Sequence, residues 1–160
     1  MKKITCPFLL LFLLSIFSNL APAFGWGQKG HDIIAYIAEN NLTCKAKKNI
    51  AKILDGKSIV YYSSWMDNLQ NSPEWKGSYD LTKTWHYANV DECETYDSMR
   101  KEPKGDIVSA VDMIKSGLRK GELSDSTEAD YLRMLVHLLG DMHCPRHAGR
   151  TNARGGNNFK

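Results

Sequence analysis

The sequence predicts a mainly α fold in one domain, and three observations support this. Apolar residues recur at intervals of three and four in several segments, as on the buried face of a helix. Residues that favour helix starts and helix ends stand at the borders of these segments. At 160 residues the chain is long enough for one hydrophobic core, and its sequence contains no internal repeat, low-complexity run or linker.

The first 25 residues have the features of a secretory signal peptide. Two lysines open the chain, residues 8–17 are apolar apart from one serine, and small residues precede Trp26 where a signal peptidase would cut. Cleavage after Ala23 is the alternative. The apolar run is too short to cross a bilayer comfortably. We therefore expect residues 26–160 to form an exported chain, secreted or periplasmic, without stable membrane association.

Three helical segments are predicted in the first part of the exported chain. Apolar residues at helical spacing occupy residues 33–38, and this segment ends near Asn40. Thr43 can cap the next helix, and Gly56 is placed to end it. Residues 58–69 form the third segment, which an Asn-Ser-Pro sequence then breaks.

Two further helices are predicted after an ambiguous segment. Residues 84–90 alternate in an extended manner and are rich in aromatic side chains, so a short strand and a loop fit equally well. Asp106 begins a helix that Gly121 ends. Asp125 and Glu128 resemble a capping pair at the start of the last helix.

Composition narrows the classes of function. Without the signal peptide the chain keeps 19 of its 21 basic residues and all 18 acidic ones, a net charge of +1. This balance argues against a broad basic surface for nucleic acids, so contacts with phosphate would have to be confined to a site. The three remaining cysteines, Cys44, Cys93 and Cys144, allow one disulfide and one free thiol, and the sequence does not select the pair.

Residues 134–147 carry the first chemical signal. On a helix His137 and Asp141 lie one above the other, and a turn at Pro145 can carry His147 back toward that face. Two imidazoles and a carboxylate suit a divalent metal such as zinc. The alternative is that His137 is a hydrogen-bonded core residue, the more common role of a single histidine among leucines.

Other positions along the chain supply further candidate ligands. The N-terminal residue is the unusual one, because its α-amine and carbonyl oxygen can chelate a metal only after cleavage frees the amine. Export would then complete the site. The candidate metal ligands are Trp26, His31, Asp67, His86, His137, Asp141 and His147.

Five short motifs, in order, resemble those of a known family. They are Trp-Gly-x-x-Gly-His at 26–31, Trp-x-Asp at 65–67, Trp-His-Tyr at 85–87, His-x-x-x-Asp followed six residues later by His at 137–147, and Gly-Gly-Asn at 155–157. With these motifs the chain resembles the S1/P1 nuclease family, which are secreted zinc nucleases that act on single strands. The resemblance runs in register from residue 26 to the end of the chain.

The resemblance implies a helical fold of the S1/P1 nuclease and phospholipase C type, with three zinc ions in a cleft. Two adjacent ions would activate a hydroxide for attack on phosphorus, so that no separate side-chain base is needed. Carried onto this sequence, the first ion would be held by Asp67, His86 and His137, the second by Trp26 and His31, and Asp141 would bridge them.

His147 would belong to the third ion. The family's other ligands of that ion lie in an Asn-Leu-His-x-x-Trp-Asp segment downstream of Gly-Gly-Asn, and this sequence ends before it at Lys160. We therefore expect the chain to be the N-terminal portion of a zinc nuclease domain, and the domain to be incomplete here.

The implied function is that of a secreted zinc-dependent endonuclease acting on single-stranded DNA and RNA and leaving 5′ phosphates. Removal of 3′ phosphates from nucleotides would be a second activity, and Asp67 and Asp141 would act through the metal ions. The expected protein is a monomer. The alternatives are a zinc-dependent phospholipase C, or a non-catalytic metal-binding fragment if Lys160 is the true C-terminus.

Four residues depart from the family pattern or resemble ligands without being one. Gln70 and Asn89 replace a cationic and an acidic residue of some members, which leaves base preference and the choice between DNA and RNA open. Cys144 lies close to the expected site, as a buried small residue or as an oxidation-sensitive thiol. His143 is not used as a ligand in the family, and we expect a supporting or core role for it.

Overall fold

A computed structural model describes residues 27–69, 71–73, 76–156 and 158 of the chain. The helices in these ranges confirm the mainly α fold, and no strand occurs within them. The predicted signal peptide, Trp26 and Gln70 lie outside the described residues. The elements, with 3-10 helices written η, are α2 (Gly27–Asn41), α3 (Cys44–Ile53), η1 (Ile59–Tyr62), α4 (Trp65–Leu69), α5 (Lys76–Thr82), α6 (Ile107–Lys120), α7 (Asp125–Met142), η2 (Pro145–His147) and η3 (Thr151–Ala153).

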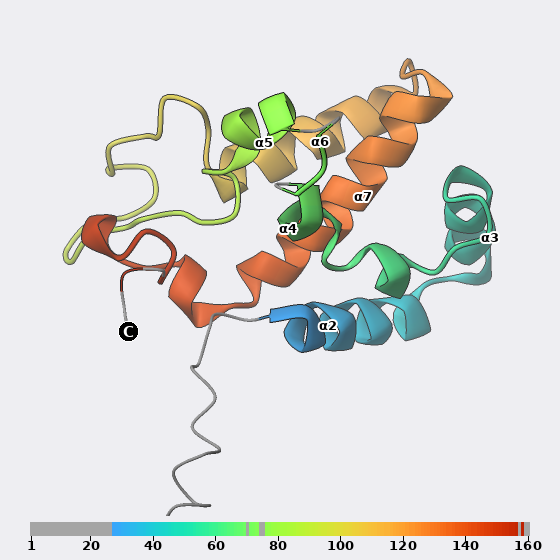
Figure 1. The fold of residues 1–160 in the computed structure, drawn as a ribbon, viewed down its shortest axis with the longest axis horizontal. Coiled ribbons are helices and arrows are strands. Elements are labelled where there is room, and N and C mark those ends of the chain that lie inside the picture. Colours follow the sequence, from blue (N-terminus) through green and yellow to red (C-terminus); the bar gives the residue numbers. More distant parts are fainter. Residues whose placement is uncertain (1–26, 70, 74–75, 157, 159–160) are drawn as a thin grey trace, which may run out of the picture.

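Helix α7 is the central element. Figure 1 shows it crossing the molecule diagonally, with α2 beneath it, α3 beside one end, and α5 and α6 above. It packs against α2, α3, η1, α4 and α6. Every other long helix therefore takes its position from α7.

The hydrophobic core lies in two clusters on opposite sides of α7. The larger one joins α4, α6 and α7 and contains Met66, Ile114 and Leu138, each fully buried. The smaller one joins α2, α3 and η1, with Leu54 at its centre. Both clusters contact α7, and His137 and Asp141 of this helix are buried as well.

Local capping explains where several of the helices begin and end. Thr43 caps α3 by accepting a hydrogen bond from the backbone amide of Ala46, as its position predicts. Asp106 caps α6 with a full capping box, and Gly121 ends that helix in the left-handed conformation. The predicted cap of α7 is off by one position, since Ser124 rather than Asp125 accepts from the helix amides.

The segment predicted as one helix over residues 58–69 is divided in two. It forms η1 and α4, separated at Ser63 and Ser64. The backbone carbonyl of Ser63 accepts a hydrogen bond from Nδ1 of His137, a contact with α7 that places this bend over the site. Helix α5 was not predicted, and residues 84–90 form a loop rather than a strand.

Residues 84–90 are held against the chain after η2 by backbone hydrogen bonds. The amide of Ala88 donates to the carbonyl of His147 at 2.9 Å, and the amide of Val90 donates to that of Gly149 at 2.8 Å. The loop thus runs beside the segment that carries His147.

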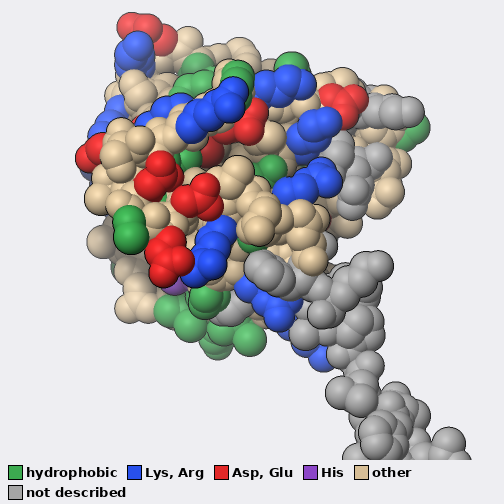
Figure 2. All heavy atoms as spheres, turned by 90° about the vertical axis from the view of Figure 1, so that its left-hand side faces the viewer, with side chains coloured by type: hydrophobic (Ala, Val, Ile, Leu, Met, Phe, Trp, Pro, Cys, Tyr) green, Lys and Arg blue, Asp and Glu red, His purple; other side chains and the backbone are tan. Residues whose placement is uncertain are grey.

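The outer face of α2 differs from the predicted buried pattern. His31 and Ala35, four residues apart, face inward, whereas Ile33, Tyr36 and Ile37 are more than half exposed. Figure 2 shows hydrophobic side chains along the lower edge of the molecule, with acidic and basic side chains interspersed above them. Within the described ranges, no helix has the length and apolar character that a membrane span requires.

Candidate metal centre

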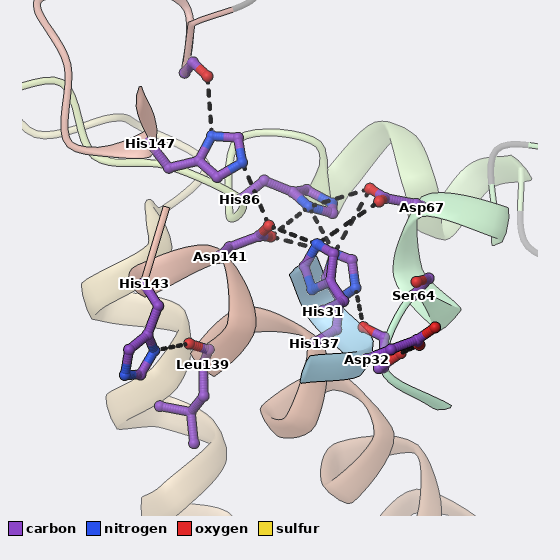
Figure 3. Close-up of polar contacts among 12 residues, drawn as sticks. His31, Asp32, Ser64, Asp67, His86, His137, Leu139, Asp141, His143 and His147 are labelled. Atoms are coloured by element: carbon purple, nitrogen blue, oxygen red, sulfur yellow. Dashed lines mark hydrogen bonds and ion pairs between the residues drawn. The ribbon is translucent and has the colours of Figure 1, made fainter. Parts of the chain in front are cut away.

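Six of the seven predicted ligands converge at one place. They come from five parts of the chain, and Figure 3 shows their polar atoms pointing toward one another. The seventh, Trp26, lies outside the described residues. The six are His31 of α2, Asp67 of α4, His86 of the 84–90 loop, His137 and Asp141 of α7, and His147 of η2.

Asp141 is at the centre of this group. Its side chain is 2% exposed, and each of its two oxygens faces a different pair of imidazoles. Such an arrangement allows one carboxylate to contact two cations, one through each oxygen. The distances are 3.2 Å from Oδ1 to His31 Nε2, 3.4 Å from Oδ1 to His147 Nε2, 2.9 Å from Oδ2 to His86 Nδ1, and 3.2 Å from Oδ2 to His137 Nε2.

Asp67 lies at the open rim of the site, with its side chain half exposed. Its Oδ1 is 3.6 Å from Nε2 of His137 and 3.8 Å from Nδ1 of His86, while its Oδ2 is 3.9 Å from Nε2 of His31. Asp67 therefore lies closest to the two histidines with which the family resemblance groups it. Its exposure leaves a side of the site accessible to a ligand.

Two of the imidazoles are held by backbone carbonyls on the side of the ring opposite Asp141. Nδ1 of His137 donates to the carbonyl of Ser63 at 2.8 Å, and Nδ1 of His147 donates to that of Gly155 at 2.9 Å. A carbonyl can only accept, so in both rings Nδ1 carries the proton and Nε2 faces the Asp141 carboxylate. This arrangement, in which the second ring nitrogen is hydrogen-bonded, is typical of metal-binding histidines.

The donor set fits a divalent metal ion. With Nδ1 protonated, a neutral His137 or His147 would direct the lone pair of Nε2 at a carboxylate oxygen, which is repulsive. A second proton on each ring or a cation between the two atoms relieves this repulsion. Imidazole nitrogens and carboxylate oxygens are the ligands that zinc takes in catalytic sites, and two overlapping groups of them lie close enough to hold an ion, His31 with Asp67 and His137, and His86 with His137 and Asp141.

Electrostatics within the cluster keep Asp141 ionised. Burial alone would raise the pKa of Asp141, but the interactions of its oxygens with the four surrounding histidines lower it by more, so the net pKa lies far below its usual range. Burial alone would lower the pKa of His147, whereas its hydrogen bond with Asp141 raises it, and the net pKa is raised. The site thus holds a fixed negative charge surrounded by basic groups.

The remaining residues discussed in the sequence lie at the edges of the site. The ring of His143 points away from the cluster, and its Nδ1 donates to the carbonyl of Leu139 at 2.7 Å (Figure 3). Cys144 is buried, and Cys44 and Cys93 are exposed; all three are free thiols.

A cavity of about 390 Å³ adjoins the cluster through Tyr87, which follows His86 in the chain. A Cβ atom at Gly155 would lie 2.8 Å from the Tyr87 ring and 3.1 Å from Nδ1 of His147. Both rings therefore pack against Gly155. Asn89 also lines the cavity, and its side-chain oxygen is buried with no hydrogen-bond partner among the described residues. Tyr87 thus places one wall of the cavity near the Nδ1 side of His147, the side that faces away from Asp141.

Sequence reasoning did not identify the groups that orient the ligands. The carbonyls of Ser63 and Gly155 belong to the backbone, so their residue types give no signal. Gly155 does lie within the Gly-Gly-Asn motif, and its positive φ of 65° accounts for glycine there. Gly140, between His137 and Asp141, was also not singled out.

Comparison with known proteins identifies a family and several relatives that the chain resembles. A family model described as S1/P1 nuclease matches residues 26–160. The chain is 27% identical to Endonuclease 2 of Arabidopsis thaliana over 150 residues, covering 85% of this chain and 50% of that protein. It is 29% identical to Nuclease P1 of Penicillium citrinum over 140 residues, covering 82% and 50%, and 26% identical to Nuclease S1 of Aspergillus oryzae over 143 residues, covering 82% and 47%. The chain spans about half the length of the curated relatives it matches.

Proposed function

The chain belongs to the S1/P1 nuclease family, and from this membership we propose that it is the N-terminal portion of an exported zinc-dependent nuclease. The proposed reaction is hydrolysis of phosphodiester bonds in single-stranded DNA and RNA to products with 5′ phosphates, with removal of 3′ phosphates from nucleotides as a second activity. The observation that carries the proposal is the pairing of the two Asp141 oxygens with separate pairs of imidazoles.

The chain's own residues supply the ligands and their orientation. Asp67, His86 and His137 would hold one zinc ion, and His31 with the N-terminal Trp26 a second. Asp141 would contact both, because each of its oxygens faces a different pair of histidines. Zinc bound there would polarise a phosphoryl oxygen and lower the pKa of a bound water.

His147 has the geometry of a ligand, and we assign it to a further ion by its resemblance to the family. Its Nε2 faces the same Asp141 oxygen as His31 does, and the Gly155 carbonyl fixes its tautomer. No side chain of the centre is proposed as a separate general base.

Preference for single strands follows from the cavity beside the centre. A base that has left its stack can lie against the Tyr87 ring, since aromatic faces bind bases regardless of sequence. Paired and stacked bases could not enter in this way.

Export and maturation are part of the proposal. Removal of residues 1–25 would free the Trp26 amine, so a protein that retains one extra residue before Trp26 should lose one zinc ion and most of its activity. N-terminal sequencing of the exported protein and its zinc content by mass spectrometry test this. Full zinc content and unchanged turnover with the extra residue would contradict it.

The direct test uses the protein expressed with its own leader and purified from the exported fraction. We expect bound zinc, cleavage of single-stranded DNA and RNA well above that of duplex DNA, loss of activity with EDTA, and recovery on addition of zinc. Hydrolysis of phosphatidylcholine without cleavage of nucleic acids would instead support a phospholipase C. Bound zinc with neither activity would support a metal-binding fragment.

A further inference from the structure

The ring of His31 is held in a different way from the other imidazoles of the cluster. His137 and His147 are each fixed by a hydrogen bond from Nδ1 to a backbone carbonyl. Nδ1 of His31 is buried and has no hydrogen-bond partner within the described ranges. His31 is only 2% exposed, so the side chains and backbone packed around the ring restrict its position.

The His31 ring is packed between two parts of α7. One of its faces stacks on the ring of His137, with centroids 4.3 Å apart and an interplanar angle of 12°. Gly140 also adjoins it: a Cβ atom at that position would lie 2.4 Å from Nδ1, 3.2 Å from Cε1 and 3.5 Å from Cγ. A separation of 2.4 Å is far inside van der Waals contact, so any side chain at this position would displace the ring.

Gly140 lies in the interior of α7, where a glycine lowers helix stability relative to alanine. The conformation does not require glycine, because its φ is that of an ordinary helical residue and lies outside the positive range. The close approach of His31 is the feature that accounts for it.

We propose that Gly140 is a positioning residue of the centre, whose missing side chain sets the place of the His31 ring. A Cβ here would push Nε2 of His31 away from Asp141 Oδ1, now 3.2 Å distant, and from Asp67. Asp141 itself directly follows Gly140, so α7 cannot shift to make room without moving that carboxylate as well. The inference about metal rests on the proposed function, whereas the packing part does not.

A double-mutant cycle between Gly140→Ala and His31→Ala separates these two parts. In EDTA-treated full chain, Gly140→Ala alone should lower the Tm. In the His31→Ala background the same change should leave the Tm equal or higher, because the ring is gone and alanine favours the helix. An equal loss of Tm in both backgrounds would overturn the proposal.

Gly117→Ala provides the matched control. Gly117 lies in α6, and a Cβ there would approach the ring of Tyr131 at 2.7 Å, so this variant also creates a clash with an aromatic ring, remote from the cluster. Its effect on Tm should be the same with and without His31, and it should leave zinc binding unchanged.

Zinc titration of the same variants tests the effect on the site. Gly140→Ala should lower the affinity for the ion that His31 holds by about 10- to 100-fold, the range for changes in groups that orient metal ligands. The affinity for the ion held by Asp67, His86 and His137 should stay as in the wild type. Unchanged affinities for every ion would overturn the positioning role, even if Tm falls. Gly140→Ala alone could fail to fold. In that case, a Gly140→Ala/His31→Ala double variant that folds supports the proposal. If the double variant does not fold although His31→Ala does, the proposal is overturned.

Discussion

At the scale of single residues, Asp141 connects the rest of the centre. Asp141→Asn keeps the shape of the side chain but replaces a carboxylate, each of whose oxygens faces a pair of imidazoles, by a neutral amide with one acceptor oxygen. We expect nuclease activity to fall by more than about 100-fold. Loss of a group that only hydrogen-bonds to a metal ligand costs up to about 100-fold, and loss of a ligand itself should cost more. Bound zinc should fall as well, because a neutral amide is a weaker zinc ligand than a carboxylate.

Asp112→Asn is the matched control, because Asp112 lies on α6 with its side chain 72% exposed. It should change neither property measurably. Zinc content by mass spectrometry and turnover of single-stranded DNA measure the two effects. Asp141→Asn with full zinc content and normal turnover would show that the carboxylate does not bind metal.

The sequence predicted which side chains form the site, but it did not predict the groups that orient them. Motif spacing identified the six side chains that the structure brings together, because a metal site restricts residue types. It did not predict how they are oriented, since Ser63 and Gly155 contribute backbone carbonyls, a group common to every residue. The ring of His31 depends on an absent side chain at Gly140, which no motif of ligands reveals.

At the scale of helices, the start of α7 offers a direct comparison of two capping residues. Ser124 accepts from the amide of Thr127 at 3.3 Å, whereas Asp125 is already within the helix. Ser124→Ala should lower the free energy of unfolding by about 0.5–2 kcal/mol. Asp125→Ala should lower it by about 0.3–1 kcal/mol, the value of a charge near the helix dipole. A larger loss for Asp125→Ala would mean that the cap lies where the sequence first suggested.

The start of α6 provides a pH-dependent prediction. The hydroxyl of Tyr96 donates to the capping carboxylate of Asp106 at 2.9 Å, and burial followed by this hydrogen bond raises the pKa of Tyr96 to about 12. Its folded pKa exceeds the ordinary tyrosine value of 10.0, so the associated stability is present below pH 10 and is lost as the pH rises through about 12. Tyr96→Phe should lower stability at pH 7 by about 1–2 kcal/mol.

Absorbance at 295 nm measures this titration. The wild type should show a tyrosine that ionises near pH 12, and Tyr96→Phe should lack that step while keeping Tyr87, whose pKa burial also raises. Tyr61→Phe, at a residue 69% exposed, should keep it. A step near pH 12 that persists in Tyr96→Phe would assign the raised pKa to another tyrosine.

Helices with regular apolar spacing and clear caps were predictable, as α3 and α6 show. The segment over residues 58–69 was not, because Ser63 breaks it to contact His137 of α7 and to donate its hydroxyl to Asp32 at 2.5 Å. The pairing of the 84–90 loop with the chain after η2 was also beyond sequence reasoning. Both depend on contacts between residues more than thirty positions apart, whose partners local patterns do not specify.

At the scale of the whole molecule, the centre joins parts of the chain that span most of the fold. Its six side chains come from α2, α4, the 84–90 loop, α7 and η2. An ion bound to them links these parts in the folded state only, so zinc should stabilise the entire protein rather than one loop.

The stabilisation can be estimated from mass action. A ligand at 100 times its dissociation constant adds about 2.7 kcal/mol, which for a chain of this size raises the Tm by about 10 °C. We expect this rise when zinc is added to EDTA-treated protein, and a much smaller one with magnesium, which prefers oxygen ligands. Differential scanning calorimetry at several zinc concentrations measures both.

The five histidines of the chain allow a matched comparison of variants. His137→Ala removes a ligand that both candidate groups share and should abolish most of the zinc-dependent rise in Tm. His143→Ala should retain it in full, because that ring points away from the cluster and bonds to its own helix. If both variants kept the rise, zinc would be binding elsewhere, and if both lost it, His143 would belong to the centre. The expected contrast between two histidines six residues apart thus tests whether the arrangement of α7 and η2 around Asp141 is the one that binds metal.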